Sequence, residues 1–186
     1  MQLPESKERL IIGITGPMGS GKTTAAEYLA SEHGFSHIRY SQVLADWFNE
    51  DPERKSELQV VGWEVMSGGS QAELNRRLLS KISSGANWVV EGLRHPLDYE
   101  SLKNAFASRF HLVYIDSSRE QRWLRLQKRG RFRTFEEFCI ADQHPVEQSI
   151  PQLKQFAEVC IASTEPLQQL YEPLGQFVKA LQKRNQ

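Results

Sequence analysis

Short apolar runs recur along the chain, and a longer segment with helical character follows each of them. The first run, LIIGIT at residues 10–15, is rich in β-branched residues, as is typical of a strand buried on both faces of a parallel sheet. Four later runs predict further strands at residues 35–40, 88–91, 110–115 and 159–162. Because strands alternate with helices, the pattern predicts a three-layer α/β domain around a parallel sheet.

The intervening segments predict helices of ordinary length. In one of them Leu74, Leu78 and Ile82 follow each other at a spacing of four and so share one face. Gly34 is placed to cap the first helix, and Pro96 stands in the first turn of another. The expected helices cover residues 22–30, 41–49, 53–66, 71–82, 96–107, 117–128, 135–141, 150–156 and 166–181. Since no repeat or linker interrupts this order, residues 1–186 are expected to form a single domain.

Composition narrows the function classes. Apolar residues make up 39% of the 186 residues and charged residues 25%, as expected of a soluble globular protein. Lys plus Arg and Asp plus Glu both number 23, so net charge favours neither nucleic acid nor an acidic membrane as a partner. No apolar run approaches the roughly 20 residues of a membrane span, and residues 1–9 are polar, so a cytoplasmic location is expected. Cys139 and Cys160 form no Cys-x-x-Cys pair, so no zinc site is expected.

Residues 16–23, GPMGSGKT, match the phosphate-loop pattern Gly-x-x-x-x-Gly-Lys-Thr between a predicted strand and a predicted helix. Glycines let the backbone turn tightly, so that successive N–H groups and the helix N-terminus face a phosphate. Lys22 can reach the β- and γ-phosphates, and the Thr23 hydroxyl can bind Mg²⁺. ATP with Mg²⁺ is therefore expected to bind at Gly16, Gly19, Ser20, Gly21, Lys22, Thr23 and Thr24. The motif alone does not choose among a kinase, a hydrolase and a nucleotide-operated switch.

An acid and an arginine follow the strand at residues 88–91. Glu91 stands at the carboxyl end of that strand, where ligands of parallel sheets bind. We expect Glu91 to orient the water ligands of Mg²⁺ and Arg94 to meet the phosphate of an acceptor. The alternative is a surface turn that carries an incidental salt bridge.

Arginines also recur on the helix predicted at residues 117–128. Arg122, Arg125 and Arg129 are spaced by three and four residues, so they share one helix face, and Arg131 and Arg133 follow. A mobile lid at about residues 129–135 would let Arg125, Arg129 and Arg131 neutralise charge on a transferring phosphoryl group. A solvated basic face is the alternative interpretation.

Five segments in this order resemble the P-loop nucleoside monophosphate kinase group, which includes adenylate kinases and dephospho-coenzyme A kinases among the AAA-type nucleotide kinases. They are GITGPMGSGKTTAAEYL, VVEGLRHP, YIDSSREQRWLRLQKRGR, TFEEFCIADQHPVEQ and AEVCIASTEPLQQL, and the resemblance spans roughly residues 10–182. It implies a three-layer P-loop kinase fold with a five-stranded parallel sheet in the order 2-3-1-4-5 and helices on both faces. It also implies an acceptor-binding helical segment at about residues 41–84, a lid at about 129–135, and Ser163 near the adenine.

The chain departs from both named relatives after the second strand. Dephospho-coenzyme A kinases have Asp-x-Asp there and adenylate kinases Ser/Thr-Gly-Asp-x-x-Arg, whereas this chain reads RYSQVLAD at residues 39–46. EGLR at residues 91–94 resembles the Asp-Gly-x-x-Arg region that holds an acceptor phosphate. Such an acceptor is already anionic near neutral pH and needs no strong base, which favours a (deoxy)nucleoside monophosphate as the small-molecule acceptor. Two alternatives stay open: a hydroxyl acceptor such as dephospho-coenzyme A, with Asp46 as base, and a nucleotide-binding regulatory or interaction protein.

Overall fold

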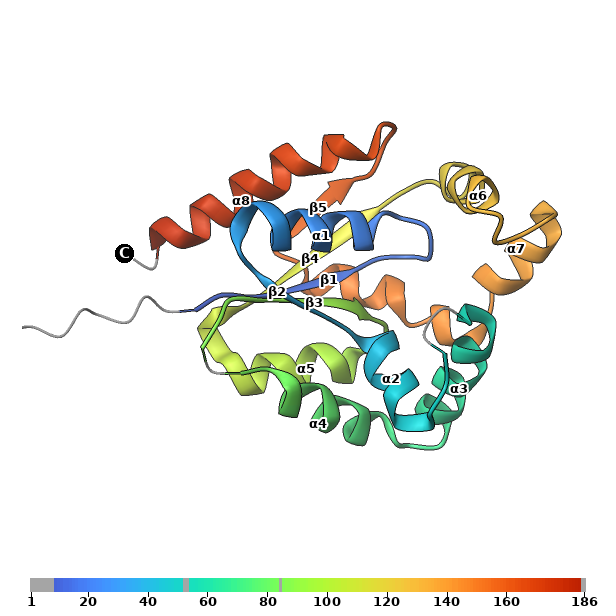
Figure 1. Ribbon diagram of the computed structural model, residues 1–186, viewed down its shortest axis with the longest axis horizontal. Coiled ribbons are helices and arrows are strands. Elements are labelled where there is room, and N and C mark those ends of the chain that lie inside the picture. The colour runs from blue at the N-terminus through green and yellow to red at the C-terminus, as the bar shows by residue number, and fades with distance from the viewer. Residues whose placement is uncertain (1–8, 52–53, 84, 185–186) are drawn as a thin grey trace, which may run out of the picture.

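The computed structural model describes residues 9–51, 54–83 and 85–184. Its five strands form one parallel sheet in the order β2-β3-β1-β4-β5, which confirms the predicted fold (Figure 1). The strands are β1 (Ile11–Thr15), β2 (Ser36–Arg39), β3 (Trp88–Leu93), β4 (Phe110–Asp116) and β5 (Val159–Ala162).

The centre of the sheet brings two predicted motifs together. All five residues of β1 are buried, and β1 pairs with β3 on one side and with β4 on the other. At its carboxyl end the register to β3 shifts, and the Thr15 hydroxyl donates to the backbone oxygen of Leu93 over 2.7 Å. The residues that follow Thr15 and Leu93 are the phosphate loop and Arg94, so both leave the sheet at the same edge.

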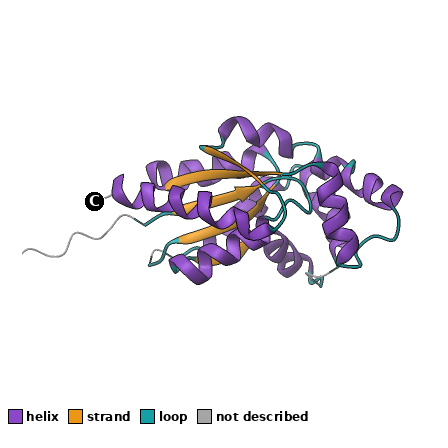
Figure 2. Cartoon of the chain, turned by 90° about the horizontal axis from the view of Figure 1, so that it is seen from above, coloured by secondary structure: helices purple, strands orange, loops and turns teal. Residues whose placement is uncertain are grey.

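Helices cover both faces of the sheet (Figures 1 and 2). α1 (Lys22–His33) and α8 (Tyr171–Arg184) lie over one face, where they bury a core with β1 and β4. α4 (Gln71–Lys81) and α5 (Pro96–Phe106) lie over the opposite face and bury a second core. Burial of apolar side chains on both faces is the main stabilising term in such a three-layer arrangement.

The remaining helices gather beyond the carboxyl edge of the sheet, which is on the right in Figure 1. They are α2 (Tyr40–Phe48), α3 (Lys55–Ser67), α6 (Arg119–Lys128) and α7 (Phe135–Asp142). A small apolar cluster of Met18, Leu126 and Phe138 packs the phosphate loop against α6 and α7. The predicted acceptor segment, residues 41–84, corresponds to α2, α3 and α4, apart from residues 52–53 and 84, which lie outside the described residues.

The C-terminal third differs in detail from the expected helices. The segment expected as a helix at residues 150–156 is the 3₁₀ helix Ile150–Phe156, whose buried Ile150 and Leu153 have the three-residue spacing of that helix type. The terminal helix begins at Tyr171 rather than at residue 166, after a separate 3₁₀ turn at Leu167–Leu170. Within the described residues, no helix combines the length and apolar character that crossing a membrane requires.

Candidate active site

The phosphate loop has a backbone that only glycine adopts readily. Gly16, Gly19 and Gly21 have φ angles of +140°, +74° and +102°. A Cβ on Gly16 would lie 2.2 Å from the backbone oxygen of Ile115, so a larger residue at this position would also displace β4. The glycine pattern therefore follows from the backbone path that leads from β1 into the N-terminus of α1.

Lys22 is held by the loop itself. Its Nζ donates to the backbone oxygens of Gly16 and Pro17 over 2.7 and 2.8 Å. Burial, together with the nearby positive charge of Arg94, lowers the pKa of the Lys22 ammonium to about 7. A bound anion would reverse this effect, because negative charge close to an amine favours its protonated form.

Thr23 and Glu91 meet although 68 residues separate them. The Thr23 hydroxyl donates to Glu91 Oε1 over 2.6 Å, and His37 Nε2 lies 3.0 Å from Glu91 Oε2. Burial works against ionisation of Glu91, but the hydrogen bonds from His37 and Thr23 and the charge of Lys22 outweigh it, so the Glu91 pKa lies below its ordinary value. A hydroxyl beside an ionised carboxylate is an oxygen-only donor set that fits Mg²⁺, which takes one or two protein ligands and completes its shell with water and phosphate oxygens.

Arg94 has a buried partner that sequence reasoning did not predict. Its guanidinium pairs with the carboxylate of Glu147, and its backbone N–H donates to Asp98 Oδ2 over 2.9 Å. Burial, together with the charge of Arg131, lowers the pKa of Arg94 to about 10, so the guanidinium stays cationic at neutral pH. Asp98 accepts from the backbone N–H groups of both Arg94 and His95, which fixes the start of α5 and with it the position of Arg94.

Arg125 has a position that calls for a revision of its predicted role. Its side chain is only 5% exposed, and its guanidinium binds Glu165, the backbone oxygens of Gly19 and Ser20, and both oxygens of Ser163. Each of the three guanidinium nitrogens thus donates a hydrogen bond to a protein atom, on the side of the loop away from the cavity. Arg125 therefore ties the phosphate loop to the segment after β5, and a lid role over the transferring group does not fit this placement.

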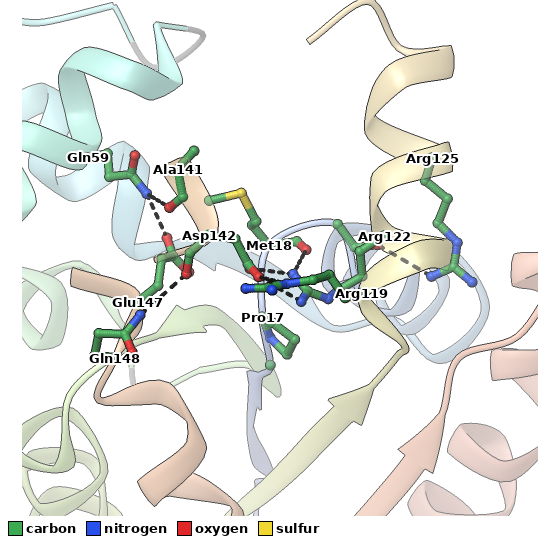
Figure 3. A network of polar contacts seen from close by, with 12 residues as sticks. Pro17, Met18, Gln59, Arg119, Arg122, Arg125, Ala141, Asp142, Glu147 and Gln148 are labelled. Carbon is green, nitrogen blue, oxygen red and sulfur yellow. Dashed lines mark hydrogen bonds and ion pairs between the residues drawn. The ribbon is translucent and has the colours of Figure 1, made fainter. Parts of the chain in front are cut away.

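Arg122, on the same helix face, is engaged in a similar way (Figure 3). It donates to the backbone oxygen of Met18 over 3.2 Å and forms two hydrogen bonds, of 2.5 and 3.0 Å, with the carboxylate of Asp142 in α7. The buried face of α6 thus holds the phosphate loop through Arg122 and Arg125. The predicted lid, residues 129–135, begins only after α6 ends at Lys128.

One cavity joins the phosphate loop to the acceptor segment. Among the predicted site residues, its lining includes Gly19, Gly21, Lys22, Thr23, Thr24, Glu91, Arg94, Arg129 and Arg131. The predicted residues Gly16, Ser20, Arg125 and Ser163 are not among the lining. Gly16 and Ser20 belong to the loop itself, and Arg125 and Ser163 are hydrogen-bonded to each other behind it. Ser163 is 1% exposed and accepts from Arg125, so its side chain supports the loop instead of facing the cavity.

Several polar residues of the lining were absent from the predicted site, and Gln59, Gln71 and Glu147 are among them. Glu147 follows α7 in the chain, and Gln59 of α3 donates to Glu147 Oε1 over 3.3 Å and to the backbone oxygen of Ala141 over 2.9 Å (Figure 3). These residues match no local motif, and only the tertiary fold brings them together. By contrast, Asp46, the predicted base for a hydroxyl acceptor, is not part of the lining and binds Lys81 over 2.6 Å.

The fold and the site together define a P-loop protein with the architecture of the small-molecule kinases. Residues 12–137 match the family model described as AAA domain. Because this match covers more than half of the chain, the protein belongs to that family.

Individual relatives agree with this assignment. A UPF0200 protein from Methanothrix thermoacetophila is 32% identical over 127 residues, which are 65% of this chain and 66%, just under two thirds, of the relative. Adenylate kinase isoenzyme 1 from Gallus gallus is 27% identical over 134 residues, 70% of this chain and 69% of the enzyme. A gluconokinase from Sinorhizobium meliloti superposes with a TM-score of 0.64 over 97% of this chain and 100% of its own, at 15% identity, and shows the fold alone. The chain is thus related to ATP-dependent kinases.

Proposed function

We propose that this protein transfers the γ-phosphoryl group of ATP, with Mg²⁺, to a nucleoside monophosphate. One observation carries the proposal: the phosphate loop and the guanidinium-bearing Arg94 line the same cavity, whose lining continues over α2, α3 and α4. A donor phosphate and an acceptor phosphate could therefore meet inside one cavity, and closure of the predicted lid would exclude water from it.

The donor end of the cavity supplies positive charge and oxygen ligands. Lys22 would move from the loop carbonyls to the β- and γ-phosphates of ATP, and the N–H groups at the start of α1 would add partial positive charge. Thr23 and Glu91 would hold Mg²⁺ directly or through water. When bound, Mg²⁺ would neutralise the charge that develops between the β- and γ-phosphates.

The acceptor end combines cations with an apolar chamber. Arg94 is suited to bidentate contact with a phosphate, for which Glu147 would give up part of its hold on the guanidinium. Arg129 and Arg131 line the cavity from the predicted lid, and they are the residues that would close over the transferring group. The apolar side chains of the chamber suit a planar ring such as a nucleobase.

The competing hydroxyl-acceptor hypothesis has less support in this geometry. A hydroxyl must lose its proton during transfer, which calls for a base within hydrogen-bond reach. Asp46 lies outside the cavity lining, and Glu91 and Glu147 are engaged with Thr23 and Arg94. An acceptor phosphate is already ionised and makes no such demand.

Replacing Arg94 with lysine tests the acceptor assignment. Arg94→Lys keeps the charge but loses the planar fork, so the acceptor KM should rise about 10- to 100-fold while the KM for ATP changes less than about twofold. Arg76→Lys is the matched control, because Arg76 is an exposed arginine on α4 that pairs with Glu73 and should leave both constants unchanged. An equal loss of ATP and acceptor binding in Arg94→Lys would contradict the assignment of Arg94 to the acceptor.

A further inference from the structure

Two contacts from different parts of the chain hold Arg94 at the cavity. Its backbone N–H donates to Asp98 Oδ2 over 2.9 Å, which fixes the main chain between β3 and α5. That contact does not orient the guanidinium, which lies at the end of a long side chain with many rotamers. Among the described residues, Glu147 is the one hydrogen-bond partner of the guanidinium, and it binds Nη1. Because the Arg94 side chain stays 35% exposed, its other donors are left for a ligand.

The local sequence holds the backbone of Glu147 in a short turn. Pro145 is the first residue of the 3₁₀ turn Pro145–Glu147, where its fixed φ angle suits helical backbone. The His144 ring accepts from the backbone N–H of Val146 over 3.3 Å, and the Glu147 N–H donates to the backbone oxygen of His144 over 2.9 Å. Val146 is buried and anchors the turn in the core. Glu147 therefore holds Arg94 from a well-fixed backbone.

A residue of α3 fixes the Glu147 carboxylate. Gln59 Nε2 donates to Glu147 Oε1 over 3.3 Å and to the backbone oxygen of Ala141 over 2.9 Å (Figure 3). The Glu147 side chain is only 4% exposed, so a change of its rotamer would leave a buried charge without partners, which is costly. The direction of the Arg94 guanidinium thus depends on α3 and on the turn after α7.

The end of α7 also contacts the donor loop. Asp142, which follows Ala141, pairs with Arg122, and Arg122 donates to the backbone oxygen of Met18 (Figure 3). Residues 141–147 are therefore linked to the phosphate loop at one end and to Arg94 at the other. This segment sets how far the donor group and the acceptor group lie from each other.

We propose that Glu147 is a positioning residue for phosphoryl transfer, which holds the Arg94 guanidinium where the acceptor phosphate meets the γ-phosphate of ATP. This role rests on the proposed function and belongs to a side chain that acts through Arg94. Misplacing a reacting group by about 1 Å costs up to about 100-fold in rate. Loss of Glu147 should therefore impair use of the acceptor, whereas ATP binding at the phosphate loop should change little.

Kinetics of Glu147 variants test this role with whichever of AMP, CMP, GMP, UMP and dTMP the native protein phosphorylates fastest. Glu147→Met removes the carboxylate at similar side-chain length. The kcat/KM for the acceptor should fall about 30- to 100-fold, with part of the loss in kcat, and the KM for ATP should stay within about twofold. Glu147→Gln keeps an oxygen that accepts from Arg94 and should recover about fivefold or more of the loss. Glu57→Gln is the matched control, because Glu57 pairs with Arg54 in an exposed contact and should leave every constant unchanged.

An Arg94→Gln background separates positioning from a general structural role. The group that Glu147 positions is then absent, so adding Glu147→Met should lower the acceptor kcat/KM by less than about twofold. A structural defect would cause the same loss in both backgrounds. Melting temperatures show which variants are folded. If Glu147→Met is not folded, Gln59→Met takes its place, since it frees the same carboxylate, with an expected loss of about tenfold.

The outcomes keep this role apart from the proposed function. An acceptor kcat/KM within twofold of native in the folded variant would overturn the role of Glu147, and so would equal losses in the native and Arg94→Gln backgrounds. Tighter acceptor binding in that variant would also overturn it, because the carboxylate would then compete with the acceptor phosphate. In these cases the native protein still phosphorylates a monophosphate. If it phosphorylates none of the five, the proposed function fails, and the positioning role fails with it.

Discussion

Lys22 should take up a proton when ATP binds above neutral pH. In the free protein, burial and the charge of Arg94 hold the pKa of its ammonium near 7. The phosphates of ATP would bring negative charge to the same place and raise that pKa toward or above its ordinary value of 10.5. Because the bound state then holds more protons than the free state, ATP affinity must fall as pH rises from 7 toward 10.5.

The size of the effect follows from these two values. At pH 8 about one tenth of Lys22 is protonated in the free protein, whereas nearly all of it is protonated when ATP is bound. Binding therefore takes up about 0.9 proton per ATP at pH 8 and about 0.5 proton at pH 7. Since only the protonated form binds well, the apparent Kd for ATP should rise about 50-fold between pH 7 and pH 9.

Titration calorimetry in buffers of different ionisation enthalpy measures this uptake directly. At pH 8 the terminal phosphate of ATP has lost its own last proton, so the slope of observed enthalpy against buffer enthalpy reports on the protein. Lys22→Arg is the control, because a guanidinium stays charged throughout this range and the slope should fall to near zero. A slope near zero for the native protein, or an unchanged slope for Lys22→Arg, would show that Lys22 does not take up the proton.

Two further predictions concern the metal and the back of the loop. Thr23→Ala should weaken ATP binding in the presence of Mg²⁺ about tenfold and leave ATP binding in EDTA nearly unchanged, as measured by thermal shift. An equal loss of binding in both conditions would show that Thr23 is not a metal ligand. Arg125→Lys should lower the free energy of unfolding by about 2–4 kcal/mol, since lysine cannot satisfy the carbonyls of Gly19, Ser20 and Ser163 together. Denaturant unfolding measures this, and full stability with a large loss of kcat would restore the lid role of Arg125.

The phosphate loop could be predicted from local sequence because its backbone demands particular residue types. Gly16 and Gly21 have positive φ angles, and Lys22 and Thr23 follow at fixed offsets in the same turn. The convergence of this loop with Glu91 also followed from topology, since the carboxyl ends of neighbouring parallel strands share one edge. The alternation of strands and helices predicted the parallel three-layer class, and the order of the strands came from the resemblance to the nucleoside monophosphate kinase group.

The direction of long side chains was not predictable in the same way. Helical spacing correctly placed Arg122 and Arg125 on one face, but it did not reveal that this face is buried against the carbonyls of the phosphate loop. Glu147 and Gln71 belong to the cavity only because α3, α4 and the turn after α7 surround it. Contacts of this kind depend on tertiary packing and leave no pattern within a single segment of the sequence.

The identity of the acceptor that receives the phosphoryl group decides whether this protein is a nucleoside monophosphate kinase. Purified protein is incubated with ATP, Mg²⁺ and each nucleoside monophosphate in turn, with dephospho-coenzyme A and gluconate as hydroxyl acceptors, and the products are separated and identified. We expect ADP together with an equal amount of one or more nucleoside diphosphates, and no product in Lys22→Ala. Phosphorylation of a hydroxyl acceptor with none of any monophosphate would contradict it, and so would tight ATP binding without transfer to any acceptor.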